Sequence, residues 1–311
     1  MTNEPIITVL GPTATGKTGV AVRIAAELGG EIVSADSRQV FRRMDIGSGK
    51  DLSEYQYNGN PIPYHLIDVE EPGREYNVYR YQQEAFKAIR DIQERGKRVV
   101  FCGGSGLYID AVLQGYRFQW QEESQILSDP VPSAIIGLRG DRDRIRERIT
   151  RRLQARLKEG MVEEVQALLD EGIPAERLIR FGLEYKYVTL YLTGELHYGD
   201  MVSLLNTAIH QFSKRQMTWF RRMERLGFHI HWPNIGGDEN LAFAGAVFHG
   251  NGQTVILEDD GLAVSVEDGA GEGEILVTAD IGPMDVESQT LHAAKPRHLP
   301  LRELVDGRVE Q

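Results

Sequence analysis

Residues 6–18 read IITVLGPTATGKT, and this stretch decides the fold class. Its apolar start is typical of a buried strand, and residues 19–28 have the apolar spacing of a helix. Between them lies Gly-x-x-x-x-Gly-Lys-Thr, a loop whose backbone amides can surround a diphosphate at the start of a helix. The residues predicted to bind a diphosphate or nucleotide are Gly11, Pro12, Thr13, Ala14, Thr15, Gly16, Lys17 and Thr18. Lys17 adds a positive charge there, and the Thr18 hydroxyl is the predicted ligand of Mg²⁺.

Strand and helix patterns alternate from this loop to about residue 115. This alternation predicts an α/β fold, a P-loop NTPase-like parallel sheet flanked by helices, followed by a helical part of the core. Strands are expected at 31–34, 64–68 and 98–102, and helices at 77–95, 141–171 and 201–225.

The charge of the chain is unevenly distributed. The formal net charge is −11, but residues 240–311 hold 13 Asp and Glu against 4 Lys and Arg. We therefore expect a core at residues 1–239 and an acidic C-terminal extension at 240–311. Strand-like runs at 254–257, 262–266 and 274–278 favour a small β-rich tail or a partly disordered one.

Residues 139–158 form a basic stripe inside the nearly neutral core, with nine Lys and Arg against three acidic residues. A local stripe of this kind can bind phosphates, although a solvated helix face has the same pattern. The acidic net charge therefore does not exclude a nucleic-acid partner.

No apolar run is long enough to span a bilayer, and the N-terminus lacks the basic start of a signal peptide. With a single cysteine, Cys102, the chain has no internal disulfide. We expect a cytoplasmic protein, without a membrane partner, that is a monomer.

Five ordered motifs resemble those of the tRNA dimethylallyltransferases, which prenylate an adenosine beside the anticodon. They are GPTATGKT from Gly11, SADSRQVFRRMDIGSGK from Ser34, HLIDVEEP from His65, GGSGLYIDAVLQG from Gly103 and SKRQMTWFRR from Ser213. The resemblance covers residues 5–232, apart from one gap. It implies that dimethylallyl diphosphate and a tRNA anticodon stem-loop are the substrates and that Mg²⁺ is required.

The resemblance also implies roles for particular residues. The predicted catalytic residues are Asp36 as general base, Lys17 and Thr18 in the loop, and Ser105 and Arg152 on the diphosphate. An adenine amine is a poor nucleophile, so the reaction needs a stabilised leaving group and an acceptor for the proton. The residues expected to contact tRNA are Asp36, Ser37, Arg38, Gln39, Lys214, Arg215 and Gln216. Tyr185 and Lys186 are weaker candidates, and Trp219 is expected in the core.

The chain also departs from this family. Residues 116–138 form a shortened insertion or lid in place of a longer helical insertion that helps to hold tRNA, and 181–186 carry an insertion within a family motif. The short segment leaves open a smaller acceptor, AMP or ATP, as in cytokinin-type prenyltransferases. A small-molecule P-loop kinase and a nucleotide-binding module without catalysis are further alternatives, because the loop by itself does not determine the chemistry.

Overall fold

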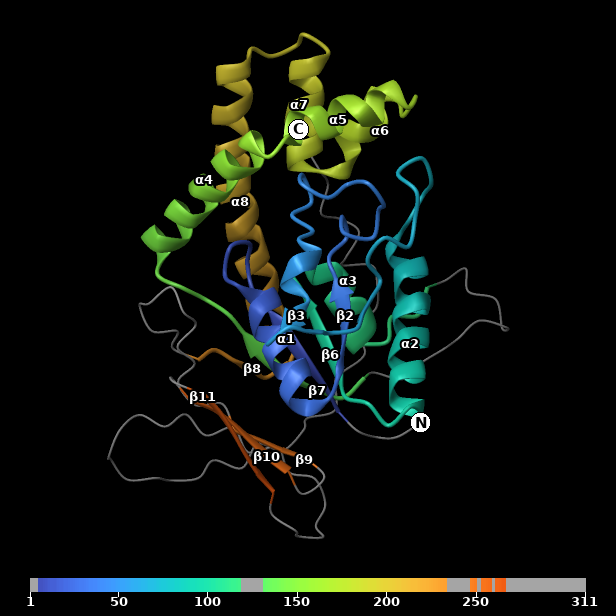
Figure 1. The fold of residues 1–311 in the computed structure, drawn as a ribbon, viewed down its shortest axis with the longest axis vertical. Coiled ribbons are helices and arrows are strands. Elements are labelled where there is room, and N and C mark those ends of the chain that lie inside the picture. Colours follow the sequence, from blue (N-terminus) through green and yellow to red (C-terminus); the bar gives the residue numbers. More distant parts are fainter. Residues whose placement is uncertain (1–4, 119–130, 234–246, 251–252, 259–260, 267–311) are drawn as a thin grey trace.

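The computed structural model describes residues 5–118, 131–233, 247–250, 253–258 and 261–266 (Figure 1). Its centre is a six-stranded sheet in the order β5-β2-β6-β1-β7-β8, in which all neighbouring strands pair in parallel. The strands are β1 (Ile6–Leu10), β2 (Glu31–Ala35), β5 (Tyr64–His65), β6 (Val99–Gly103), β7 (Ser133–Gly137) and β8 (Ile230–His231). The predicted parallel α/β sheet is confirmed.

Helices cover both faces of this sheet, which explains why β1, β2 and β6 are buried at every position. One core cluster packs α1 (Lys17–Leu28) against one face, and a second cluster contains α2 (Val78–Glu94) and α3 (Gly106–Leu113). Between β2 and β5 the chain forms η1 (Leu52–Glu54) and a hairpin of β3 (Gln56–Tyr57) and β4 (Asn60–Pro61).

The second half of the core is helical and lies above the sheet in Figure 1. It contains α4 (Arg142–Lys158), α5 (Met161–Asp170), α6 (Ala175–Phe181), α7 (Leu183–Leu192) and the long α8 (Tyr198–Arg225). Because α8 runs from the top of this helical part down to the sheet, one end of it reaches the sheet and its strand-end loops (Figure 1). None of the helices in the described ranges is long and apolar enough to cross a membrane.

Three sequence predictions differ from this structure. The helix expected at 141–171 is two helices, α4 and α5. Gly160 lies between them with a φ of 103°, a left-handed conformation that a continuous helix cannot contain. The strand expected at 64–68 stops at His65, since Leu66 and Asp68 have positive φ angles. Within 116–138, the segment predicted as an insertion or lid, residues 133–137 are strand β7 of the central sheet, and 119–130 lie outside the described residues.

The C-terminal extension contributes an antiparallel sheet with strand order β11-β10-β9. Its strands are β9 (Val247–Gly250), β10 (Gln253–Glu258) and β11 (Gly261–Val266), of which the last two match the predicted runs at 254–257 and 262–266. The third predicted run, 274–278, lies outside the described residues.

Candidate active site

The phosphate-binding loop connects β1 to α1, as the sequence predicts. Gly16 has a φ of 80° and directly precedes the first helical residue, Lys17, so the first amides of α1 face the loop. The Lys17 ammonium group donates a hydrogen bond to the Pro12 carbonyl at 2.8 Å, and the Thr15 hydroxyl donates to the same carbonyl at 2.8 Å. The loop is therefore held in a closed turn by its own side chains.

The ends of β2 and β6 form the opposite wall of the site. The Ser105 amide donates to the Ala35 carbonyl at 3.1 Å, and the Ser105 hydroxyl accepts from the Ser37 amide at 2.9 Å. The Asp36 carboxylate accepts from the Arg38 amide at 3.0 Å, which turns the chain after β2. Asp36 and Ser105 thus lie on two adjoining strand ends, where parallel sheets bind ligands.

Lys17 interacts electrostatically with groups at the ends of β2 and β6. Burial lowers the pKa of Lys17 below its usual value, Arg152 lowers it further, and Cys102 and Asp36 act in the opposite direction. The position that a Cβ atom would occupy on Gly104 is 3.6 Å from the Lys17 nitrogen, so the β6 loop lies directly against the lysine. The structure therefore brings Lys17, Asp36 and Ser105 to one end of the sheet.

Gln216 of α8 bridges the two glycine-rich loops. Its side-chain oxygen accepts a hydrogen bond from the Thr13 amide at 2.9 Å, and its side-chain nitrogen donates to the Gly104 carbonyl at 2.8 Å. Gln216 is only 8% exposed. The side chain predicted to contact RNA is thus buried and bonded to the protein backbone, and here it fixes the phosphate loop relative to the β6 loop.

Two of the predicted RNA contacts, Arg38 and Arg215, lie over the ring of Phe212, which the sequence did not single out. The Arg38 guanidinium lies 5.1 Å from the centre of the Phe212 ring, and that of Arg215 lies 5.9 Å from it. Arg38 also donates to the Phe181 carbonyl at 3.0 Å, whereas Lys214 and Arg215 are exposed. Phe212 precedes Gln216 by one helical turn, and that spacing is the signal that could have identified it.

Ser37 and Gln39 are half-buried and bonded within the protein. The Gln39 amide accepts from the Ser34 hydroxyl at 3.3 Å and donates to the Gly49 carbonyl at 3.4 Å. Both side chains therefore help to shape the segment that follows Asp36.

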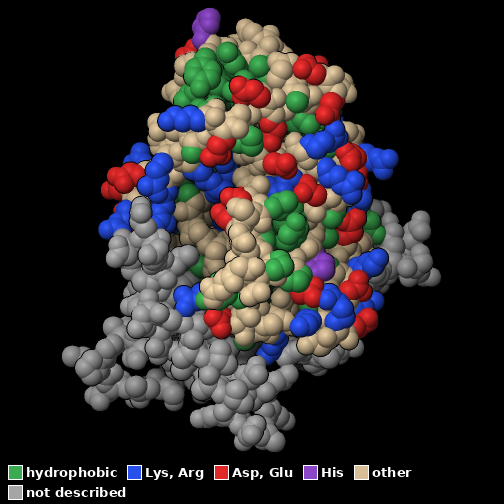
Figure 2. Space-filling model, viewed as in Figure 1, with side chains coloured by type: hydrophobic (Ala, Val, Ile, Leu, Met, Phe, Trp, Pro, Cys, Tyr) green, Lys and Arg blue, Asp and Glu red, His purple; other side chains and the backbone are tan. Residues whose placement is uncertain are grey.

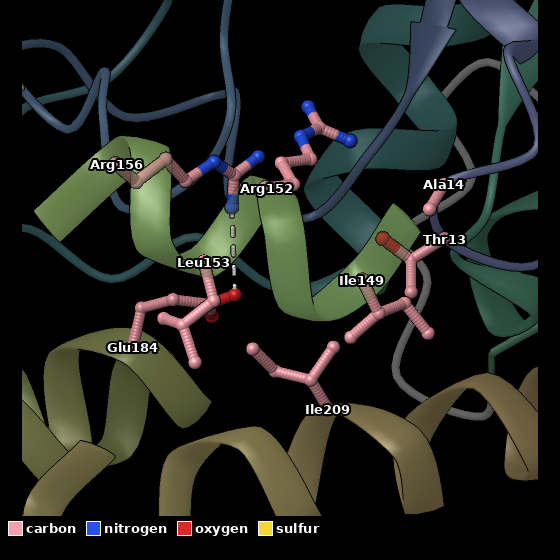
Figure 3. Close-up of a pocket in the computed structure, with 8 residues that line it drawn as sticks. All are labelled: Thr13, Ala14, Ile149, Arg152, Leu153, Arg156, Glu184 and Ile209. Atoms are coloured by element: carbon pink, nitrogen blue, oxygen red, sulfur yellow. Dashed lines mark ion pairs between the residues drawn. The ribbon is translucent and has the colours of Figure 1, made fainter. Parts of the chain in front are cut away.

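A small, partly open cavity lies between the tip of the phosphate loop and helices α4, α7 and α8 (Figure 3). Its apolar wall is formed by Ile149, Leu153 and Ile209. Its charged residues are Arg152 and Arg156 of α4 and Glu184 of α7. The lining is completed by Thr13 and Ala14. Arg152, which the sequence singled out, therefore shares one cavity with the phosphate loop.

The segment after Asp36 is anchored to the helical part by Glu164 of α5. One Glu164 oxygen accepts from the amides of Asp45 and Ile46 at 2.8 and 2.7 Å, and the other accepts from Gly47 at 3.0 Å. The Tyr185 hydroxyl donates to that second oxygen at 2.9 Å. The sequence pattern gave no signal for this role of Glu164, because a glutamate on an amphipathic helix is typical of a solvated face.

Tyr185 itself is fully buried, and Lys186 is exposed beside the Tyr187 ring. The Trp219 indole donates to buried Asp110 at 2.9 Å, in agreement with its expected packing role. Burial raises the pKa of Asp110, and hydrogen bonds from Gln114 and Trp219 oppose that rise.

The residues at the loop fit the kind of site that Mg²⁺ uses with phosphates. Among the described residues there is no cluster of three or more His, Cys, Asp or Glu side chains that could hold a metal. Mg²⁺ is usually bound through one or two protein oxygens together with substrate phosphates and water, and the Thr18 hydroxyl at the second position of α1 can supply such an oxygen.

Comparison with known proteins identifies relatives of this chain. A sequence model described as IPP transferase matches residues 39–128 and 117–223, two pieces that overlap at residues 117–128. The chain is 46% identical over 285 residues to tRNA dimethylallyltransferase 1 of Parabacteroides distasonis, covering 75% of this chain and 93% of that protein. It is 45% identical over 302 residues to the protein of that name from Porphyromonas gingivalis, covering 79% of this chain and all of that protein.

Solved structures of similar fold are also transferases that act on tRNA. The tRNA isopentenylpyrophosphate transferase of Bacillus halodurans superimposes with a TM-score of 0.65 at 28% identity, covering 74% of this chain and 90% of that one. A eukaryotic dimethylallyltransferase acting on tRNA shares the fold, with a TM-score of 0.62 at 18% identity and 74% of each chain covered. The chain belongs to the IPP transferase family.

Proposed function

We propose that this protein transfers a dimethylallyl group from dimethylallyl diphosphate to N6 of the adenosine 3′-adjacent to the anticodon, tRNA position 37. Two relatives that are 45–46% identical carry the name tRNA dimethylallyltransferase. The observation that carries the proposal for this chain is a carboxylate, Asp36, beside a phosphate-binding loop at the end of one parallel sheet.

In this reaction the adenine N6 attacks C1 of the dimethylallyl group while the bond from C1 to the diphosphate oxygen breaks. The electron pair of that bond leaves with the diphosphate, and the proton lost from N6 passes to the Asp36 carboxylate. The loop amides, Lys17 and Arg152 would stabilise the charge that develops on the diphosphate. Bound Mg²⁺, held by Thr18, would supply further positive charge.

Ser105 would act in this mechanism through its position beside the segment that carries Asp36. Its hydroxyl already accepts from the Ser37 amide, next to Asp36, and it begins α3 without capping the first turn of that helix. The hydroxyl also donates to the Ser37 hydroxyl at 3.2 Å, so on substrate binding it would turn this one proton to a diphosphate oxygen while it still accepts from the Ser37 amide.

The RNA would approach from the side of α4 and α8. Lys214 and Arg215 are exposed on α8, and the Arg38 and Arg215 guanidinium groups both lie over the Phe212 ring. In Figure 2 one group of Lys and Arg side chains lies at the left of the molecule, where Figure 1 places α4, and other groups lie at the right. We infer that the protein acts as a cytoplasmic monomer on tRNA, using Asp36, Ser37, Arg38 and Gln39 on one side of the site and Lys214 and Arg215 of α8 on the other.

A free adenine nucleotide is the second candidate acceptor, because the family match is divided at the segment where a longer insertion is expected. Transfer of a labelled dimethylallyl group to an anticodon stem-loop, with AMP and ATP in parallel, distinguishes the two. The matched control is a stem-loop with guanosine in place of the reacting adenosine.

The Asp36→Asn variant keeps an oxygen that can accept from the Arg38 amide, so it removes the base and preserves the turn. We expect label on the adenosine stem-loop and a kcat about 10² to 10⁴ lower in the variant. Label on AMP or ATP alone would show that the acceptor is a free nucleotide and not RNA. The absence of label on every acceptor would contradict the proposed reaction.

A further inference from the structure

The charged wall of the cavity in Figure 3 contains two cations and one anion. Arg152 donates to the Gly49 carbonyl at 3.3 Å, and Arg156 donates to the Gly47 carbonyl at 3.4 Å. A Cβ atom on Gly49 would collide with both guanidinium groups, so the two groups converge on this glycine.

These two arginines use little of their hydrogen-bonding capacity. A guanidinium has five N–H donors, and each of the two makes one long bond to a carbonyl among the described residues. Burial, and then repulsion from Arg152, lowers the pKa of Arg156 to about 10, so Arg156 keeps its charge at neutral pH. A pair of like charges with unused donors beside a phosphate-binding loop favours an anion with several oxygens.

Glu184 is the acidic group in the same wall, and its contact with Arg156 is loose. Its carboxylate oxygen lies 3.6 Å from an Arg156 nitrogen, which is an ion pair but too long for a hydrogen bond. Its other oxygen is buried without a hydrogen-bond partner in the described part of the chain. Since Glu184 is only 7% exposed, water stabilises this carboxylate poorly.

We propose that Arg156 is a further ligand of the diphosphate subsite that the proposed function assigns to the loop and Arg152, and that Glu184 competes with the anion for Arg156. The source of the diphosphate rests on the proposed function. When the subsite is empty, Glu184 keeps Arg156 in the wall of the cavity. When a diphosphate arrives, Arg156 turns its unused donors to the anion, and repulsion from Glu184 limits how tightly the product is held.

The proposal predicts opposite effects for the two partners. Arg156→Met removes a charge of the subsite and should weaken binding of diphosphate. Glu184→Gln removes the competing charge at nearly constant volume and should strengthen that binding. If Arg156 and Glu184 formed only a structural ion pair, both variants would break the same contact. Diphosphate binding would then change in the same direction in both.

The experiment measures the binding of inorganic diphosphate, in the presence of Mg²⁺, to the full chain by titration calorimetry. We expect the Kd to rise about tenfold or more in Arg156→Met and to fall about threefold or more in Glu184→Gln. The double variant should bind like Arg156→Met, within about twofold, if Glu184 acts through Arg156. Arg142→Met, on the exposed first residue of the same helix, is the matched control and should leave the Kd unchanged.

An unchanged Kd in Arg156→Met, or weaker binding in Glu184→Gln, would overturn the proposal. If Arg156→Met does not fold, as judged by its thermal transition, Arg156→Lys replaces it; the lysine keeps the charge but loses the planar donors, so binding should still weaken at least threefold, and wild-type binding would overturn the proposal. The calorimetry contains neither tRNA nor dimethylallyl diphosphate. A failure of the proposed transfer reaction therefore does not affect this test of diphosphate binding. In the transfer assay, Glu184→Gln should also be inhibited by diphosphate at lower concentrations than the wild type.

Discussion

At the scale of single residues, the position of the Ser105 hydroxyl is easiest to test because two substitutions separate its hydrogen bonds from its volume. Ser105→Ala leaves the Ser37 amide without its acceptor and removes a donor to the diphosphate. A hydrogen bond to a charged group contributes about 1.5 to 3 kcal/mol, so we expect kcat/KM to fall about 10 to 100-fold. Ser105→Thr keeps the hydroxyl and should retain most activity. Equal losses in both variants would show that crowding, and not the hydroxyl, matters.

Cys102 provides a test of the electrostatics at the sheet end. Burial raises the pKa of Cys102 to about 12, although Lys17 lowers it, so the thiol stays protonated at pH 8. The reactive form of cysteine is the thiolate, and we therefore expect no alkylation by iodoacetamide in the native protein and complete alkylation in denaturant. Mass spectrometry of the two samples gives the answer, and rapid native labelling would contradict this placement of Cys102.

At the scale of elements, Gln216 connects α8 to two loops that belong to different strands. Gln216→Ala would leave the Thr13 amide and the Gly104 carbonyl without their buried partners. We expect a loss of about 1 to 3 kcal/mol in the free energy of unfolding for each group left unsatisfied, together with a higher KM for dimethylallyl diphosphate. Denaturant titration and steady-state kinetics measure the two effects. A stable variant with normal KM would mean that the phosphate loop holds its shape without α8.

The same contacts explain how far the sequence alone could predict the site. Glycine and lysine spacing predicts the loop at 11–18, and alternating patterns predict β1, β2 and β6, because both signals are local. Strand β7 and the role of Glu164 were missed. The first is a short apolar run that directly follows a polar, turn-rich segment, and the second depends on which loop packs against α5. Gln216 was assigned to RNA for the same reason: only the fold shows that its helix reaches the loops.

At the scale of the whole molecule, exposed positive charge on α8 should control affinity for RNA without affecting the fold. Lys214 is exposed and lies two residues from buried Gln216. Comparing Lys214→Ala with Gln216→Ala therefore separates an effect on the surface of α8 from an effect on its buried contacts. We expect Lys214→Ala to unfold like the wild type, to bind the stem-loop more weakly, and to reduce the slope of log K against log salt by about 0.7 to 0.9, the value of one phosphate contact. An unchanged slope would exclude a phosphate contact at Lys214.

The uneven charge of the chain leads to a prediction for the extension at 240–311. This segment holds most of the net negative charge, whereas α4 carries the basic stripe at 139–158. The family match ends at residue 223 and the central sheet closes with β8, so removal of 240–311 leaves every strand of that sheet in place. If the acidic segment competes with RNA for the basic helix, its removal should tighten stem-loop binding at low salt, and the difference should shrink as salt screens both interactions. Binding curves at two or more salt concentrations test this expectation; equal affinities of the full and shortened chains at low salt would mean that the acidic extension does not compete with RNA.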